Sequence, residues 1–135
     1  IDVTASAVTY TSFVAELIRD GKLEAKRSDK DVVFQDPCQL SRDLEETEEA
    51  REIIMSYAVL GEMLLNRNET VWAGNILMAE YMPEVMKKVA ARRIFNAKSI
   101  NAKTIVTASV SEYASLKSVD QSDVEIMSLE DLILG

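Results

Sequence analysis

The sequence predicts an α/β protein: a mostly parallel sheet of about four to five strands with helices on both faces, in a single domain. Short runs rich in β-branched residues alternate with stretches whose apolar residues recur at helical spacing. That alternation favours parallel strands, because the chain must cross back through a helix before each new strand. The 135 residues, with 47% hydrophobic and 28% charged side chains, suit one domain around one core.

A helix and a buried strand come first. Apolar residues recur at helical spacing over residues 8–20, and Gly21 is typical of a helix C-terminus. A polar connection follows, with a short extended piece expected at residues 23–26. Residues 32–35, "VVFQ", indicate a buried strand, which Pro37 ends.

A second helix is expected over residues 44–57, with Ser41 or Asp43 as its N-cap. Its apolar residues fall on one side. Glutamates crowd the other side, mostly in the first half: Glu45, Glu46, Glu48, Glu49 and Glu52. Acidic residues there suit the positive end of the helix dipole. We interpret them as a solvated face and not as a catalytic carboxylate pair or a cation site.

The middle of the chain predicts a second extended segment over residues 59–65, a polar turn at 66–69 and a short third strand at 70–72. The longest helix is expected at residues 76–97. Its methionines are interpreted as core filler. Four basic residues on this helix are interpreted as a solvated face and not as a phosphate site: Lys87, Lys88, Arg92 and Arg93.

The last third predicts a strand at residues 104–108, a helix at 111–116, a strand at 124–127 and a helix at 129–134. The two ends of the chain look alike, since each places a short apolar strand before a Leu-containing helix. We therefore expect residues 1–135 to be one domain, with residues 1–30 as a leading helix and connection, cut from a longer protein built of two similar units.

Composition excludes several function classes. The formal net charge of -8 disfavours nucleic-acid binding, and the lack of histidine excludes His-based triads and His-ligated zinc. One cysteine cannot form an internal disulfide, which is typical of the cytoplasm. No apolar run of about 18 residues exists, so we expect no transmembrane segment. No signal peptide is visible, and any membrane association would run through partner subunits.

Functional residues of parallel sheets gather at the carboxyl ends of the strands. Three corners of the sequence fit that rule. They are Asp36-Pro37-Cys38, Trp72-Ala73-Gly74 and the stretch from Ser109 to Glu112.

These corners carry a resemblance to a known family. "VVFQDPCQLSRDL" resembles the start of the cysteine-rich CCG domain, which occurs in heterodisulfide reductase and in the iron–sulfur subunits of glycolate oxidase and anaerobic glycerol-3-phosphate dehydrogenase. "ELIRDGKLEAK" is similar to the helix before the family's first motif. "NRNETVWAGN" and "AKTIVTASVSEY" stand where the family has Cys-Cys-Gly and Cys-x-x-Cys, at the family's spacing.

The sequence keeps the spacing of the family's motifs but lacks most of their cysteines. Cys38 matches the first family cysteine. Trp72 and Ala73 stand in place of the paired cysteines, and Ser109 and Glu112 stand in place of the last two. Iron–sulfur clusters need several thiolates in one place, whereas serine and glutamate are hard oxygen ligands. The resemblance thus implies no cluster and no other metal in this domain, with 4Fe–4S clusters elsewhere in the parent protein.

The flanking residues follow the same resemblance in part. Gly74 matches the motif glycine, and Arg42 matches a common basic residue of the family. Gln39 replaces the histidine often found after the first cysteine. Asp36, before Pro37, is interpreted as a turn residue that bonds its own backbone.

Three functions stay open. The first is a structural or partner-docking unit of an iron–sulfur oxidoreductase, non-catalytic by itself, in contact with other domains or subunits of an electron-transfer complex. The second is a non-redox module that binds a small ligand or a protein in the vacated pocket lined by Cys38, Trp72, Ser109 and Glu112. The third is thiol chemistry at Cys38, with Arg42 as the nearest cation in sequence. An apolar face exposed by the cut would also permit a homo-oligomer.

Overall fold

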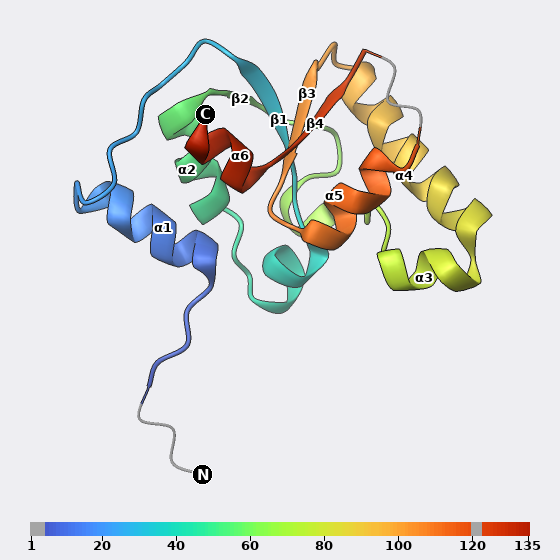
Figure 1. The fold of residues 1–135 in the computed structure, drawn as a ribbon, viewed down its shortest axis with the longest axis horizontal. Helices are drawn as coiled ribbons and strands as arrows, with labels where there is room; N and C mark the ends of the chain where they lie inside the picture. The colour runs from blue at the N-terminus through green and yellow to red at the C-terminus, as the bar shows by residue number, and fades with distance from the viewer. Residues whose placement is uncertain (1–4, 120–122) are drawn as a thin grey trace.

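The computed structural model describes residues 5–119 and 123–135 (Figure 1). In these residues a four-stranded sheet has the order β2-β1-β3-β4. Its strands are β1 (Asp31–Gln35), β2 (Val59–Gly61), β3 (Thr104–Thr107) and β4 (Glu125–Ser128). All three neighbouring pairs are parallel. The predicted α/β class is confirmed.

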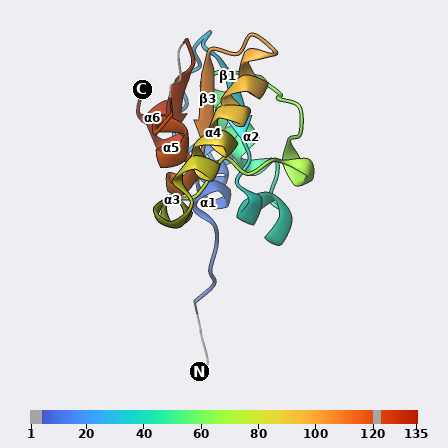
Figure 2. The same cartoon turned by 90° about the vertical axis from the view of Figure 1, so that its right-hand side faces the viewer.

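Helices cover both faces of the sheet (Figures 1 and 2). One face is covered by α1 (Tyr10–Arg19), α2 (Glu49–Tyr57) and α6 (Leu129–Leu134), and the other by α4 (Pro83–Lys98) and α5 (Val110–Lys117). The short α3 (Ile76–Tyr81) contacts α4 and α5.

Strand β1 divides its side chains between two cores. Val32 and Phe34 belong to the core under α1, α2 and α6, whereas Val33 points into the core under α4 and α5. Successive residues of a strand face opposite sides of the sheet, so a continuous apolar run such as "VVF" is what a strand covered on both faces requires.

The strand order creates a crevice at the carboxyl ends of β1 and β3. These strands are neighbours, yet the chain leaves β1 toward α2 on one face and β3 toward α5 on the other. In open α/β sheets, such a reversal is the usual place for a functional site. A π-helical turn, Gln39–Asp43, follows β1 at this crevice.

The expected strand at residues 70–72 is wrong, because this segment has no partner strand in the described residues. Its backbone is held by side chains instead. Gln35 Nε2 donates to Val71 O at 3.0 Å, and Arg42 Nη2 donates to Thr70 O. The extended segment expected at residues 59–65 is a strand only over Val59–Gly61, and residues 23–26 form no strand.

The helix expected from residue 44 begins at Glu49, and neither Ser41 nor Asp43 caps it. Ser41 Oγ instead donates to Pro37 O at 3.1 Å within the π-helical turn. Glu45 adopts a φ of 54°, which a helix cannot continue through.

The helix expected at residues 76–97 is two helices. Met82, with φ -138° and ψ 60°, separates α3 from α4 because Pro83 disfavours a helical conformation in the residue before it. Not all of the apolar residues expected to face the core along this segment do so. Met86 is buried, whereas Met82 and Val85 are exposed.

The remaining elements are confirmed with shifts of one or two residues at their ends: α1, β1, β3, α5, β4 and α6. Of the segment before α1, where a short strand was expected, residues 1–4 lie outside the described part of the chain and residues 5–9 form no strand. None of the described helices has the length and apolar character needed to span a membrane.

Candidate functional site at the carboxyl edge of the sheet

Buried hydrogen bonds join the three predicted corners. Thr70 Oγ1 donates to Asp36 O at 3.0 Å, which ties the first corner to the segment leading into the second. Ala73 N donates to Glu112 Oε1 at 3.2 Å, which ties the second corner to the third. The structure thus brings the three corners together around one point of the fold.

Glu112 is the centre of this arrangement. Ser109 is the N-cap of α5, and its Oγ accepts a hydrogen bond from Glu112 N at 3.3 Å, which fixes the first turn of the helix. The Glu112 side chain, 2% exposed, then points back under the corners. Its carboxylate accepts from Ala73 N and, at 3.4 Å, from Gln35 Nε2.

Burial makes the Glu112 carboxyl a weaker acid than an exposed glutamate. Desolvation raises the pKa of Glu112 to about 7. The hydrogen bonds from Ala73 and Gln35 and the positive charge of Arg93 oppose that shift without cancelling it.

A buried arginine lies on the other side of Gln35. Arg93 is fully buried; its Nε donates to Gln35 Oε1 and its Nη1 to Leu64 O at 2.9 Å. Its Nη2 has no hydrogen-bond partner among the described residues. Gln35 thus links the Arg93 guanidinium to the Glu112 carboxylate. The expectation that Arg93 belongs to a solvated face is wrong, whereas Lys87, Lys88 and Arg92 are exposed as expected.

Asp36 is not the self-bonding turn residue that the sequence suggested. Its carboxylate forms a two-point contact with Arg51 at 2.6 and 2.8 Å and also accepts from Arg67 N at 2.9 Å. Arg51 is shared with the partly exposed Glu62, whose oxygens lie 2.7 and 3.0 Å from Arg51 Nε and Nη2. Asp36 therefore anchors the loop of Arg67 against α2.

Cys38 is half-buried at the start of the π-helical turn. Burial raises the pKa of its thiol, and the negative charges of Glu112 and Asp43 add to the increase. The charge of Arg42 lowers the pKa but does not outweigh these effects. The Arg42 guanidinium is itself bound to Asn68 O at 3.0 Å and to Thr70 O. A thiolate nucleophile needs a lowered pKa, so this environment disfavours the thiol-chemistry hypothesis.

The other predicted residues have mainly packing roles. Trp72 is half-buried, Ala73 is fully buried and Gln39 is exposed. Gly74 has φ +114°, and a Cβ at this position would lie 2.8 Å from both Cβ and Oγ of Ser115. Only glycine fits there without strain. Pro37 is buried under the first corner.

Sequence reasoning missed the roles of Gln35, Arg51 and Arg93, whose buried side chains form hydrogen bonds around the corners. A signal existed for the two arginines. Arg51 lies three residues before Ile54 on α2, and Arg93 lies three residues after Ala90 and four before Ala97 on α4, so each places a charge at an inward-facing position of its helix. Such charges are rarely buried unless they are paired.

The residues at the crevice do not fit an iron–sulfur cluster. Cys38 supplies a single thiol, and the Glu112 carboxylate is engaged with Ala73 and Gln35. Within residues 5–119 and 123–135, no group of three or more Cys, Asp or Glu side chains is arranged to hold a metal ion. A neighbouring pocket of about 380 Å³ lies at the ends of β3 and β4 and includes Ser109 in its lining, together with Tyr113, Ser128 and Glu130.

Comparison of the chain with protein-family models, curated protein sequences and solved structures finds no match. The resemblance to the CCG domain therefore rests on the corner residues and their spacing.

Proposed function

We propose that this chain is a cluster-free unit of an iron–sulfur oxidoreductase related to the CCG-domain component of heterodisulfide reductase, and that it serves as a structural or partner-docking domain in electron transfer. One observation carries the proposal. The point at which the three corners meet is occupied by the buried Glu112 carboxylate, hydrogen-bonded to Ala73 N and Gln35 Nε2. In the proposed relationship, these groups stand where the family has its cluster ligands.

The physical chemistry of the corner supports a structural role. Buried hydrogen bonds between distant segments rigidify a fold, and the links from Gln35 to Val71 and from Glu112 to Ala73 connect segments far apart in the sequence. Two side chains beside this network are poorly suited to catalysis: burial raises the pKa of the Cys38 thiol, and the Asp36 carboxylate is bound by Arg51 and Arg67.

Anaerobic reconstitution with iron and sulfide tests the absence of a cluster. We expect a colourless protein without bound iron or sulfide after desalting. A brown protein with several irons per chain would contradict the proposal, because it would make Cys38 the anchor of a cluster with unusual ligands.

Restoring the family's cysteines tests the relationship itself. The variant Trp72→Cys/Ala73→Cys/Ser109→Cys/Glu112→Cys is expected to become brown under the same treatment if the corners keep the family's geometry. A control that retains Trp72 and Ala73 and carries only Ser109→Cys/Glu112→Cys should bind much less iron. Circular dichroism of both variants before reconstitution separates failure to fold from failure to bind. A folded four-cysteine variant without iron would count against descent from a cluster domain.

A second function has a specific observation in its favour. The pocket at the ends of β3 and β4 has a volume typical of a small-molecule site and lies at the functional edge of the sheet. A non-redox module that binds a small ligand or a peptide would use this pocket, next to the filled corner. Chemical-shift changes at the Ser109 and Ser128 amides, recorded by NMR during a ligand screen, would support it. Shifts that scatter over the molecule, or none at all, would count against it.

A further inference from the structure

The outer side of α4 faces away from the sheet and no other element lies over it in Figure 2. Five exposed residues follow one another along this side at spacings of four and three residues, which we call the outer stripe: Glu84, Lys88, Ala91, Phe95 and Lys98. Spacings of four and three place residues in a single line along a helix, as in a coiled-coil seam. The outer stripe is therefore a continuous surface.

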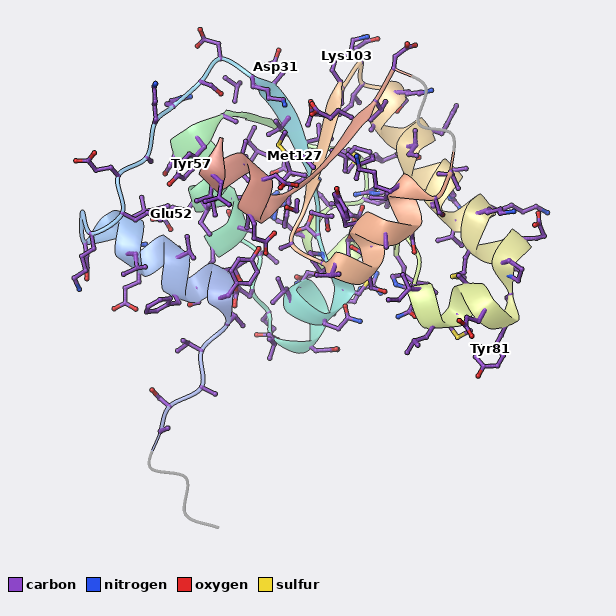
Figure 3. All side chains as sticks on the ribbon, in the orientation of Figure 1. Asp31, Glu52, Tyr57, Tyr81, Lys103 and Met127 are labelled. Atoms are coloured by element: carbon purple, nitrogen blue, oxygen red, sulfur yellow. The ribbon has the colours of Figure 1, made fainter. Side chains whose placement is uncertain are left out.

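Phe95 is a large apolar residue on a face that is exposed to solvent. Its side chain is 68% exposed and points away from the core formed by Ile94 and Ala97 on the same helix. Tyr81, just before α4, is 82% exposed, and Figure 3 shows it projecting from the end of the molecule. Large aromatic side chains are enriched in protein–protein interfaces.

The charges of the outer stripe on one copy are complementary to those on a second copy whose α4 helix runs in the opposite direction. Ala91 lies at its centre, with Glu84 seven residues before it and Lys98 seven residues after it. A second copy packed antiparallel about Ala91 would place Glu84 of each copy against Lys98 of the other. Lys88 of each copy would meet Phe95 of the other, where its methylene stem and ammonium group can pack on the ring.

Helix α4 carries five basic residues and one acidic residue, whereas the chain as a whole has 23 acidic and 15 basic residues. Two such helices repel each other through their excess positive charge, so the attraction between two copies has to come from the two Glu84–Lys98 contacts and the two Lys88–Phe95 contacts. The small side chain of Ala91 lets the two helix axes come close together.

We propose that the outer stripe of α4 is the contact surface for a second copy of this chain in an antiparallel, twofold-symmetric dimer. In such a contact the same surface serves both partners, and each contact occurs twice. The proposal does not depend on whether the carboxyl edge binds a cluster. The contact involves one helix from each copy, so we expect a weak and concentration-dependent dimer.

Sedimentation equilibrium of the full chain over a range of concentrations measures this association. Phe95→Ser is expected to raise the dimer dissociation constant by about tenfold or more. Val110→Ser is the matched control, because Val110 is also highly exposed, at 79%, but belongs to α5 at the carboxyl edge. It should leave the dissociation constant unchanged. Both substituted side chains are exposed, so the fold should tolerate both changes.

Charge exchange tests the antiparallel geometry. Glu84→Lys and Lys98→Glu should each abolish self-association, because each puts like charges opposite one another. An equimolar mixture of the two variants should form a heterodimer, because both opposite-charge contacts are restored. A wild-type chain that stays monomeric at every concentration would overturn the proposal and leave the surface to another partner. A dimer that resists Phe95→Ser, or variants that fail to associate when mixed, would overturn it as well.

Discussion

Asp36 and Arg51 form a two-point ion pair in which both side chains are only 1% exposed, with oxygen–nitrogen distances of 2.6 and 2.8 Å. The pair joins the corner after β1 to helix α2, and Asp36 extends it to Arg67 N. A buried pair of this kind contributes little compared with an apolar replacement of both residues, yet the loss of one partner leaves an uncompensated charge. Its main effect is to hold the corner after β1 and the loop of Arg67 against α2.

Asp36→Ala should destabilise the protein by about 3–5 kcal/mol, because the buried Arg51 loses its main partner. Urea unfolding measures the change. Asp29→Ala, at an exposed position, is the control and should have little effect. The double variant Asp36→Ala/Arg51→Met should lose less than the sum of the two single variants. Additive losses would show that the two residues act independently.

The stability of the protein should depend on pH through Glu112. Its pKa is raised in the folded state from 4.5 to about 7, so the folded protein holds this proton more tightly than the unfolded chain does. The stabilisation from this group is fully present below pH 4.5 and is lost as the pH rises through 7. Glu112→Gln keeps the shape and removes the ionisation. Relative to the wild type, its free energy of unfolding should rise by up to about 3 kcal/mol between pH 4 and pH 8.

Urea unfolding at several pH values tests this difference. Glu69→Gln, on an exposed turn, is the control and should follow the wild-type profile. A constant difference between Glu112→Gln and the wild type over the whole range would mean that Glu112 does not titrate there.

The Cys38 thiol should react slowly with iodoacetamide at neutral pH. Burial raises its pKa, and Glu112 adds to the increase when ionised, so little thiolate is present. Alkylation rates measured against pH give the pKa directly. Glu112→Gln should shift the profile to lower pH, because a negative charge near the thiol is removed. A thiol that reacts faster than free cysteine at pH 7 would revive the hypothesis of thiol chemistry.

Gly74→Ala should destabilise the second corner by about 1–3 kcal/mol. The new Cβ would lie 2.8 Å from Ser115, and φ at this position is +114°. Gly61→Ala is the matched control, since the nearest atom to its Cβ would be Val33 Cγ1 at an ordinary 3.5 Å. Adding Ser115→Gly to Gly74→Ala should recover part of the loss, because it removes the clash and leaves the backbone strain. No recovery would place the whole cost in the backbone.

The sequence predicted the α/β class because the buried strands of a parallel sheet are locally visible. Val32 to Phe34 and Thr104 to Val106 are short runs of β-branched and aromatic residues bounded by turn residues, a pattern typical of strands. The segment at residues 70–72 looked similar, yet its backbone is bound by the side chains of Gln35 and Arg42. Local pattern does not reveal which donors reach a segment from elsewhere in the fold.

By itself the sequence determined the positions of the three corners, since turn and strand signals are short-range and the spacing between corners is a property of the chain. Only the tertiary structure decided what occupies the space between them. The order β2-β1-β3-β4 brings Gln35, Arg93 and Glu112 together from three separate elements. Their burial and charge depend on what packs around them, so the raised pKa of Glu112 and the role of Asp36 follow from contacts that no stretch of sequence contains.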